Sequence, residues 1–163
     1  MGRRDLMRSS RLGGLLLLLG IVSITGCDES SEITPPATPP GYPLAYVMQD
    51  CAPWDGPALA IVLTSQPLDS LETVRPLLRL MIYPRGESMP GHTYRWPAQP
   101  EMAAASRCTS ADSCEAATAG QVTLRVVRPD TLVEGRLALR FANGEKIMGG
   151  FRAAWLRRRA MCG

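Results

Sequence analysis

Five cysteines and a single histidine are the side chains of this 163-residue sequence best suited to chemistry. A Ser-His-Asp or Cys-His site would have to use His92, and no serine lies in a Gly-x-Ser-x-Gly motif. A hydrolytic metal site usually needs several histidine and carboxylate ligands, and the sequence has no Gly-rich phosphate loop or dinucleotide motif. We therefore expect no catalytic residues, no metal site and no cofactor. A small hydrolase built on His92 and a carboxylate is the less favoured alternative.

The first cysteine, Cys27, follows an N-terminal segment with the composition of an export signal. Residues 1–11 contain four arginines and one aspartate, and residues 12–24 are apolar apart from Ser23. A basic region, a short apolar region and small residues before a cleavage site are typical of secretory signals. The apolar region is shorter than the roughly 20 residues that a membrane-spanning helix needs. We therefore expect this segment to direct export.

The four residues that end at Cys27 resemble the lipobox of bacterial lipoproteins. They read ITGC: an aliphatic residue, a small residue, glycine, then cysteine. The resemblance implies that residues 1–26 are removed as a signal peptide and that a diacylglyceryl group is attached to the Cys27 sulfur. Thr25 departs from the pattern mildly, since Ala or Ser is commoner there. The lipobox class implies an extracytoplasmic protein held at a membrane by its lipid, and the choice between inner and outer membrane stays open.

The other four cysteines are Cys51, Cys108, Cys114 and Cys162. In an exported chain, four cysteines indicate two disulfides, for which three pairings exist. We predict a Cys108–Cys114 bridge because the short polar segment between them can close as a turn. We predict a Cys51–Cys162 bridge that ties the first strand region to the last. A four-cysteine metal site is the alternative, but the paired CxxC spacing is missing.

Proline and charge divide the rest of the chain. Residues 28–43 contain five prolines and no apolar periodicity, which predicts an extended stalk over residues 27–43. Residues 44–163 have the usual size of one domain. Of 18 basic and 15 acidic residues, four and one lie in residues 1–11, which leaves 14 of each. The mature chain is therefore neutral, which gives no support for binding to nucleic acid.

Strand signals dominate the predicted domain. Apolar runs at residues 58–64 and 77–83 are bounded by turn residues, and residues 121–128 alternate between apolar and polar. Residues 68–74 and 101–107 are each a candidate short helix or turn, and the second is equally a candidate strand of small residues. Six or seven short strands favour a single antiparallel β-sandwich with two disulfides, and a small β-barrel is the second choice.

A hairpin is predicted around Asn143 and Gly144. A two-residue loop would bring charged side chains onto the apolar face, whereas the three-residue loop 142–144 keeps the apolar residues of both strands together. Gly144 supplies the left-handed residue that such a loop needs. The predicted cross-strand pairs are Phe141 with Glu145, Leu139 with Ile147, Leu137 with Gly149, and Gly135 with Phe151.

Residues 91–97 concentrate side-chain types that are favoured in recognition surfaces. A sugar or peptide could stack on Tyr94 or Trp96, with Arg95 as a hydrogen-bond donor and His92 nearby. The alternative is that His92, Tyr94 and Trp96 alternate inward as strand residues. Trp54, beside a turn, is more simply a lid on the core.

Function is predicted only as a class. The stalk, the neutral domain and the poverty of catalytic residues favour a membrane-anchored, extracytoplasmic lipoprotein that binds a protein, glycan or peptidoglycan of the cell envelope. A structural or assembly subunit of an envelope complex is the alternative. The arginines at residues 157–159 could meet an anionic partner, but such a run is more often a solvated chain end.

Overall fold

A computed structural model of the chain describes residues 37–68, 74–86, 88–157, 160 and 162. The predicted signal peptide, Cys27 and most of the candidate helix at residues 68–74 lie outside this part. The described residues form nine β-strands and no helix. Among them, therefore, no helix is long and apolar enough to cross a membrane. The strands are β1 (Leu44–Cys51), β2 (Pro57–Thr64), β3 (Leu77–Ile82), β4 (Thr93–Trp96), β5 (Ala103–Cys108), β6 (Cys114–Ala116), β7 (Ala119–Arg128), β8 (Leu132–Arg140) and β9 (Lys146–Trp155).

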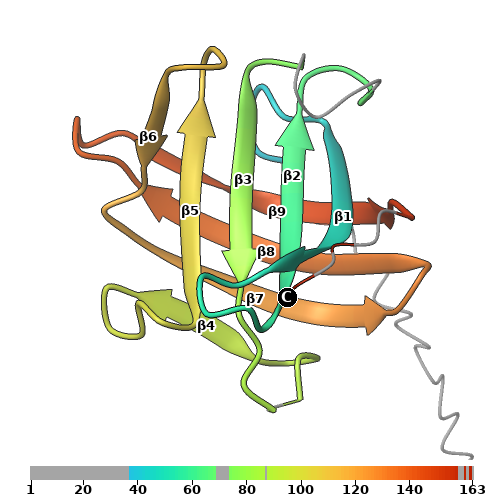
Figure 1. Cartoon of the computed structure of the whole chain (residues 1–163). Helices are drawn as coiled ribbons and strands as arrows, with labels where there is room; N and C mark the ends of the chain where they lie inside the picture. The colour runs from blue at the N-terminus through green and yellow to red at the C-terminus, as the bar shows by residue number, and fades with distance from the viewer. Residues whose placement is uncertain (1–36, 69–73, 87, 158–159, 161, 163) are drawn as a thin grey trace, which may run out of the picture. The chain divides into compact units, whose positions relative to one another are not determined.

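All nine strands belong to one curled sheet with the order β4-β7-β8-β9-β1-β2-β3-β5-β6. In Figure 1, the strands β2, β3 and β5 cross in front of β7, β8 and β9. The two halves of the sheet thus face each other and enclose the core, as in orthogonal sheet packing. The chain is mainly β, as predicted.

The prediction of an antiparallel sandwich of two sheets is wrong, because the two halves belong to one continuous sheet that includes a parallel pair. β1 pairs with β2 in antiparallel fashion and with β9 in parallel fashion, through Tyr46 with Ala154 and Val47 with Trp155. These two pairs join the first strand of the domain to the last and make the sheet mixed. Turn residues between neighbouring strands predict hairpins, but they carry no information about a pairing between strands so far apart in the chain.

The core lies between the two halves of the sheet. Its fully buried side chains come from both halves, and the outward residues of β8 from Glu134 to Arg140 are polar or small. Strand β2 is buried on both faces, because Ala60 and Val62 form a second apolar cluster with Met48 and Leu77 on the outer side. Its continuous apolar sequence fits a central strand. The largest fully buried side chains are Tyr94, Phe141, Ile61, Leu63, Leu78, Leu80, Ile82, Leu124 and Leu139.

The β8–β9 hairpin has the predicted register. Leu139 pairs with Ile147 and Gly135 with Phe151, and the Phe141 amide donates to the Glu145 carbonyl at 3.0 Å. Gly144 has a positive φ of 83°, as the three-residue loop requires. The segment at residues 101–107 resolves into the strand alternative, as β5.

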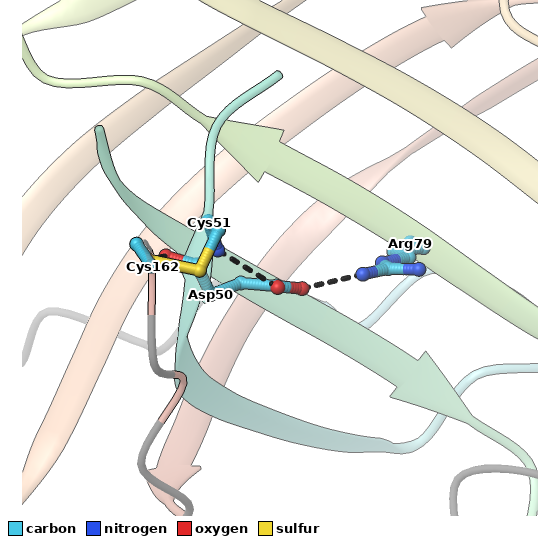
Figure 2. Close-up of a disulfide and its surroundings, with 4 residues drawn as sticks. All are labelled: Asp50, Cys51, Arg79 and Cys162. Carbon is cyan, nitrogen blue, oxygen red and sulfur yellow. Dashed lines mark hydrogen bonds and ion pairs between the residues drawn. A yellow bond between two sulfur atoms is a disulfide. The ribbon is translucent and has the colours of Figure 1, made fainter. Parts of the chain in front are cut away.

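Both predicted disulfides are present. Cys51 is bonded to Cys162, and Cys108 is bonded to Cys114 across the β5–β6 turn. Figure 2 shows the first bridge beside Asp50, whose carboxylate accepts from the Cys51 amide at 2.8 Å and from Arg79 at 2.5 Å. The bridge therefore fastens the end of the chain to β1.

Residues 37–43, which were predicted to belong to the stalk, pack on the domain. From Ala37 onward the chain lies against β9, where the Gly150 amide donates to the Ala37 carbonyl at 2.8 Å. Pro39 is buried, and Tyr42 is part of the main core. The predicted boundary at residue 44 is thus too late. An aromatic side chain two residues before it anchors the proline-rich segment in the core.

Candidate functional site

The outer face of β4, β7, β8 and β9 gathers basic side chains around an apolar strip. Cross-strand pairing places Arg95, Gln121, Ala138 and Met148 in one row across the four strands. One neighbouring row contains Arg140 opposite Lys146, and the other contains Arg136. We call this surface the basic face, and it consists of Arg95, Gln121, Arg136, Ala138, Arg140, Lys146 and Met148.

Two adjoining hollows lie on the basic face. The first has a volume of about 630 Å³, and Arg95, Arg140 and Lys146 line it together with Met148. The second has a volume of about 570 Å³ and is lined by Arg136. Both hollows share Gln121, Ala138 and Met148. Met148 is 61% exposed, and it and Trp54 are the exposed large apolar side chains of the described residues.

Of the residues that the structure describes, four cations and no acid line the two hollows. Two nearby acids are engaged elsewhere. Glu145 pairs with Arg107 at 2.6 Å, and Glu134 pairs with Arg152 at 3.5 Å. The basic face therefore has a positive charge that the lining residues do not balance, which favours an anionic ligand.

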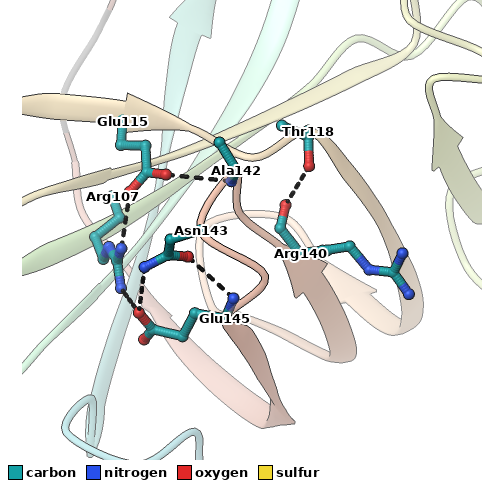
Figure 3. A network of polar contacts seen from close by, with 7 residues as sticks. All are labelled: Arg107, Glu115, Thr118, Arg140, Ala142, Asn143 and Glu145. Carbon is teal, nitrogen blue, oxygen red and sulfur yellow. Dashed lines mark hydrogen bonds and ion pairs between the residues drawn. The ribbon is translucent and has the colours of Figure 1, made fainter.

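The ion pair of Glu145 is part of a small polar network (Figure 3). Arg107 also pairs with Glu115 at 2.8 Å, and its guanidinium lies 4.4 Å from the centre of the Phe141 ring. Hydrogen bonds to Glu145 and then Glu115 raise the pKa of Arg107, and the hydrogen bond from Arg107 lowers the pKa of Glu145. The Glu145 backbone amide also donates to the side-chain oxygen of Asn143 at 3.0 Å. The network joins the β5–β6 hairpin to the β8–β9 loop and gives Glu145 an ion-pair partner outside the basic face.

The structure separates the four residues that were predicted to bind a ligand. Tyr94 is fully buried, and Trp96 is 7% exposed and donates from Nε1 to the Ala117 carbonyl at 3.3 Å. The half-buried His92 ring lies 4.5 Å from that of Tyr94, and its Nε2 has no hydrogen-bond partner among the described residues. These positions match the alternative of inward-facing strand residues. Arg95 is exposed, and it reaches the first hollow together with the edge of Trp96.

Trp54 is more exposed than a core lid would be, at 47%. Its ring meets the edge of the Tyr83 ring at 5.2 Å between centroids, and Arg85 lies 4.8 Å from the centre of the Trp54 ring. Burial raises the pKa of the Tyr83 phenol. Trp54 thus covers Tyr83 on one side and faces solvent on the other.

Sequence reasoning missed most of the basic face, although a signal was present. The three-residue loop in the hairpin sets the parity of both strands, and it directs every even residue from 136 to 152 outward. Four of those residues are basic: Arg136, Arg140, Lys146 and Arg152. The same alternation predicts both faces of the hairpin, the apolar one and the basic one. Within the part of the chain that the structure covers, no group of three or more metal-ligating side chains comes together.

Fold and site together define a disulfide-bonded β domain with an exposed face that is both basic and apolar. No protein-family model, curated protein or solved structure matches the chain.

Proposed function

We propose that this chain is an exported lipoprotein, anchored by lipid on Cys27, whose β domain binds an anionic component of the cell envelope through the basic face. The domain acts by binding and not by catalysis. One observation carries the proposal: among the described residues, four cations and no acid line two adjoining hollows around the exposed Met148. A neutral mature chain that collects cations on one face has a directional positive field, which attracts anionic ligands.

A structural or assembly subunit remains the second candidate. The exposure of Met148 favours it, because exposed apolar side chains within a polar rim are common at protein interfaces. The anchor is common to both candidates, so the identity of the contact at the basic face distinguishes them.

Site-specific photocrosslinking in the producing cells tests the proposal. A photoreactive amino acid replaces Met148 in the full-length protein, and a matched variant carries it at Glu101, which is exposed in the β4–β5 turn. We expect crosslinks to an envelope component from position 148 and none from position 101. A protein of fixed stoichiometry in the crosslink indicates an assembly subunit. Equal crosslinking from both positions, or none from either, would contradict a binding role for the basic face.

The lipid anchor needs its own test. Cells are fed a labelled fatty acid, and the wild-type protein is compared with Cys27→Ser. We expect label on the wild-type protein and none on the variant. Label on both proteins, or on neither, would contradict the anchor at Cys27.

A further inference from the structure

We infer that the ligand of the basic face is an anionic phospholipid bilayer, on which the domain lies with its cations against lipid phosphates and Met148 beneath them. This inference rests on the proposed function, because it names the ligand class of the same face. It follows from the arrangement of charge and apolar surface and from the position of Ala37 at the edge of the basic face.

The apolar strip of the basic face consists of Ala138 and Met148, and cations lie on both sides of it. Ala138 pairs with Met148 across β8 and β9. Arg140 and Lys146 form the row on one side of this pair, and Arg136 lies in the row on the other side. A membrane interface has the complementary layers, with anionic headgroups above and apolar chains beneath. Both hollows are open to solvent and adjoin on one face, which suits an extended surface better than a small enclosed ligand.

The segment that follows Cys27 in the chain reaches the edge of the same face at Ala37. Ala37 and Thr38 line the second hollow, and the Ala37 carbonyl is bonded to Gly150 on β9. Ala37 lies ten positions after Cys27, and even a fully extended segment of this length spans at most about 35 Å. A domain of some 120 residues has a comparable diameter. A lipid on Cys27 would therefore keep the rim of the basic face close enough to lie on the membrane.

An acidic polysaccharide is the main competing ligand. Its acidic groups would bind the cations, but it would leave the exposed Met148 and the other apolar residues that line the first hollow without a ligand contact. Displacement of water from apolar surface is favourable only when an apolar partner covers it. The combination of cations with an exposed methionine therefore favours lipid.

Lys146 provides a specific probe, because it is the only lysine in the chain. The lipid-anchored full-length protein is placed in vesicles of phosphatidylcholine, with or without phosphatidylglycerol. The labelling rate of Lys146 with an uncharged amine reagent is then measured by peptide mass spectrometry. We expect labelling at least about fivefold slower on the anionic vesicles, the factor that one basic residue contributes at such a surface. The difference should fade at high salt.

Three variants separate docking from mere proximity to the membrane. Arg95→Gln with Arg140→Gln should restore fast labelling on anionic vesicles, and Met148→Ser should restore it in part. Arg85→Gln removes a positive charge outside the basic face and should leave the protection unchanged. Equal rates on both kinds of vesicle would overturn the inference, as would equal protection by soluble polyphosphate without anionic lipid. Crosslinks from position 148 to an anionic glycan would still support the proposed function after either result, whereas crosslinks to a protein of fixed stoichiometry would indicate an assembly subunit.

Discussion

Gly149 on β9 lies so close to Pro39 that a Cβ on Gly149 would stand 2.5 Å from the Pro39 nitrogen. The same Cβ would approach the Ala37 carbonyl oxygen to 2.9 Å. Both contacts are with backbone or ring atoms, which cannot move aside as a flexible side chain can. The absence of a side chain at Gly149 thus allows residues 37–39 to lie on the sheet.

Gly149→Ala should therefore displace residues 37–40 from β9. We expect a loss of about 1–3 kcal/mol in the free energy of unfolding, as for other overpacked sites, together with faster proteolysis within residues 37–43. Urea denaturation and limited proteolysis measure the two effects. Ala154→Ser, at an exposed position of the same strand, is the control. Wild-type stability and protease resistance in Gly149→Ala would show that the segment does not rest on Gly149.

The two disulfides should differ in their contribution to stability. The Cys51–Cys162 bridge spans 111 residues and the Cys108–Cys114 bridge spans 6. The chain-entropy model gives about 5 kcal/mol for the first loop and about 2 kcal/mol for the second. Paired Cys→Ser variants, compared by urea denaturation, should reproduce this order. An equal or larger loss from the short bridge would contradict the role of the long bridge as the fastening of the chain end.

Tyr94 should behave as a core residue and not as a ligand platform. Tyr94→Ala should lower the free energy of unfolding by about 3–5 kcal/mol, the usual cost of truncating a buried aromatic side chain. Arg95→Ala, one residue away and exposed, should change it by less than about 0.5 kcal/mol. Thermal and urea unfolding of both variants make the comparison. A Tyr94→Ala protein as stable as the wild type would contradict the core role of Tyr94 and favour a role in ligand binding.

The Arg107–Glu145 pair should make stability depend on acid pH. The pKa of Glu145 is lowered in the folded chain by the hydrogen bond from Arg107. Its stabilising effect is therefore complete above the ordinary glutamate pKa of about 4 and is lost as the pH falls through the lower folded value. We expect the stability difference between the wild-type protein and Glu145→Gln to shrink below about pH 4.

Urea denaturation across this pH range measures the difference. Glu101→Gln, which changes the same charge in a turn, is the control for general charge effects. A difference between wild type and Glu145→Gln that stays constant down to the lowest pH would contradict the pairing.

Local patterns in the sequence predicted the strands and the hairpin register well. Leu139 and Ile147 pair because burial admits only one parity of the strands, and Gly144 fits only a loop with a left-handed residue. The two disulfides followed from the number of cysteines and the shortness of the Cys108–Cys114 segment. The hairpin register depends on residues that are close together in the chain. The disulfides depend on the small number of possible pairings among four cysteines.

Long-range pairing and surface composition were not predicted. The parallel contact of Tyr46 with Ala154 joins strands more than 100 residues apart, and no turn residue reports it. The basic face combines Arg95 on β4 with Arg140 and Lys146 from the hairpin, so it exists only once β4 has paired with β7. The aromatic residues beside Arg95 attracted the binding prediction, but the same alternation that exposes Arg95 turns Tyr94 inward.

The most direct test of the proposed binding role is the reactivity of Lys146 in envelopes isolated from the producing cells. Isolated envelopes that carry the anchored protein are treated with an amine reagent before and after a mild detergent disperses them, and the peptide containing Lys146 is quantified. We predict at least about fivefold slower labelling in the intact envelope, since one basic contact at an anionic surface contributes about 1 kcal/mol. Equal labelling before and after dispersal would mean that the basic face is free in the envelope and would contradict the proposed binding role.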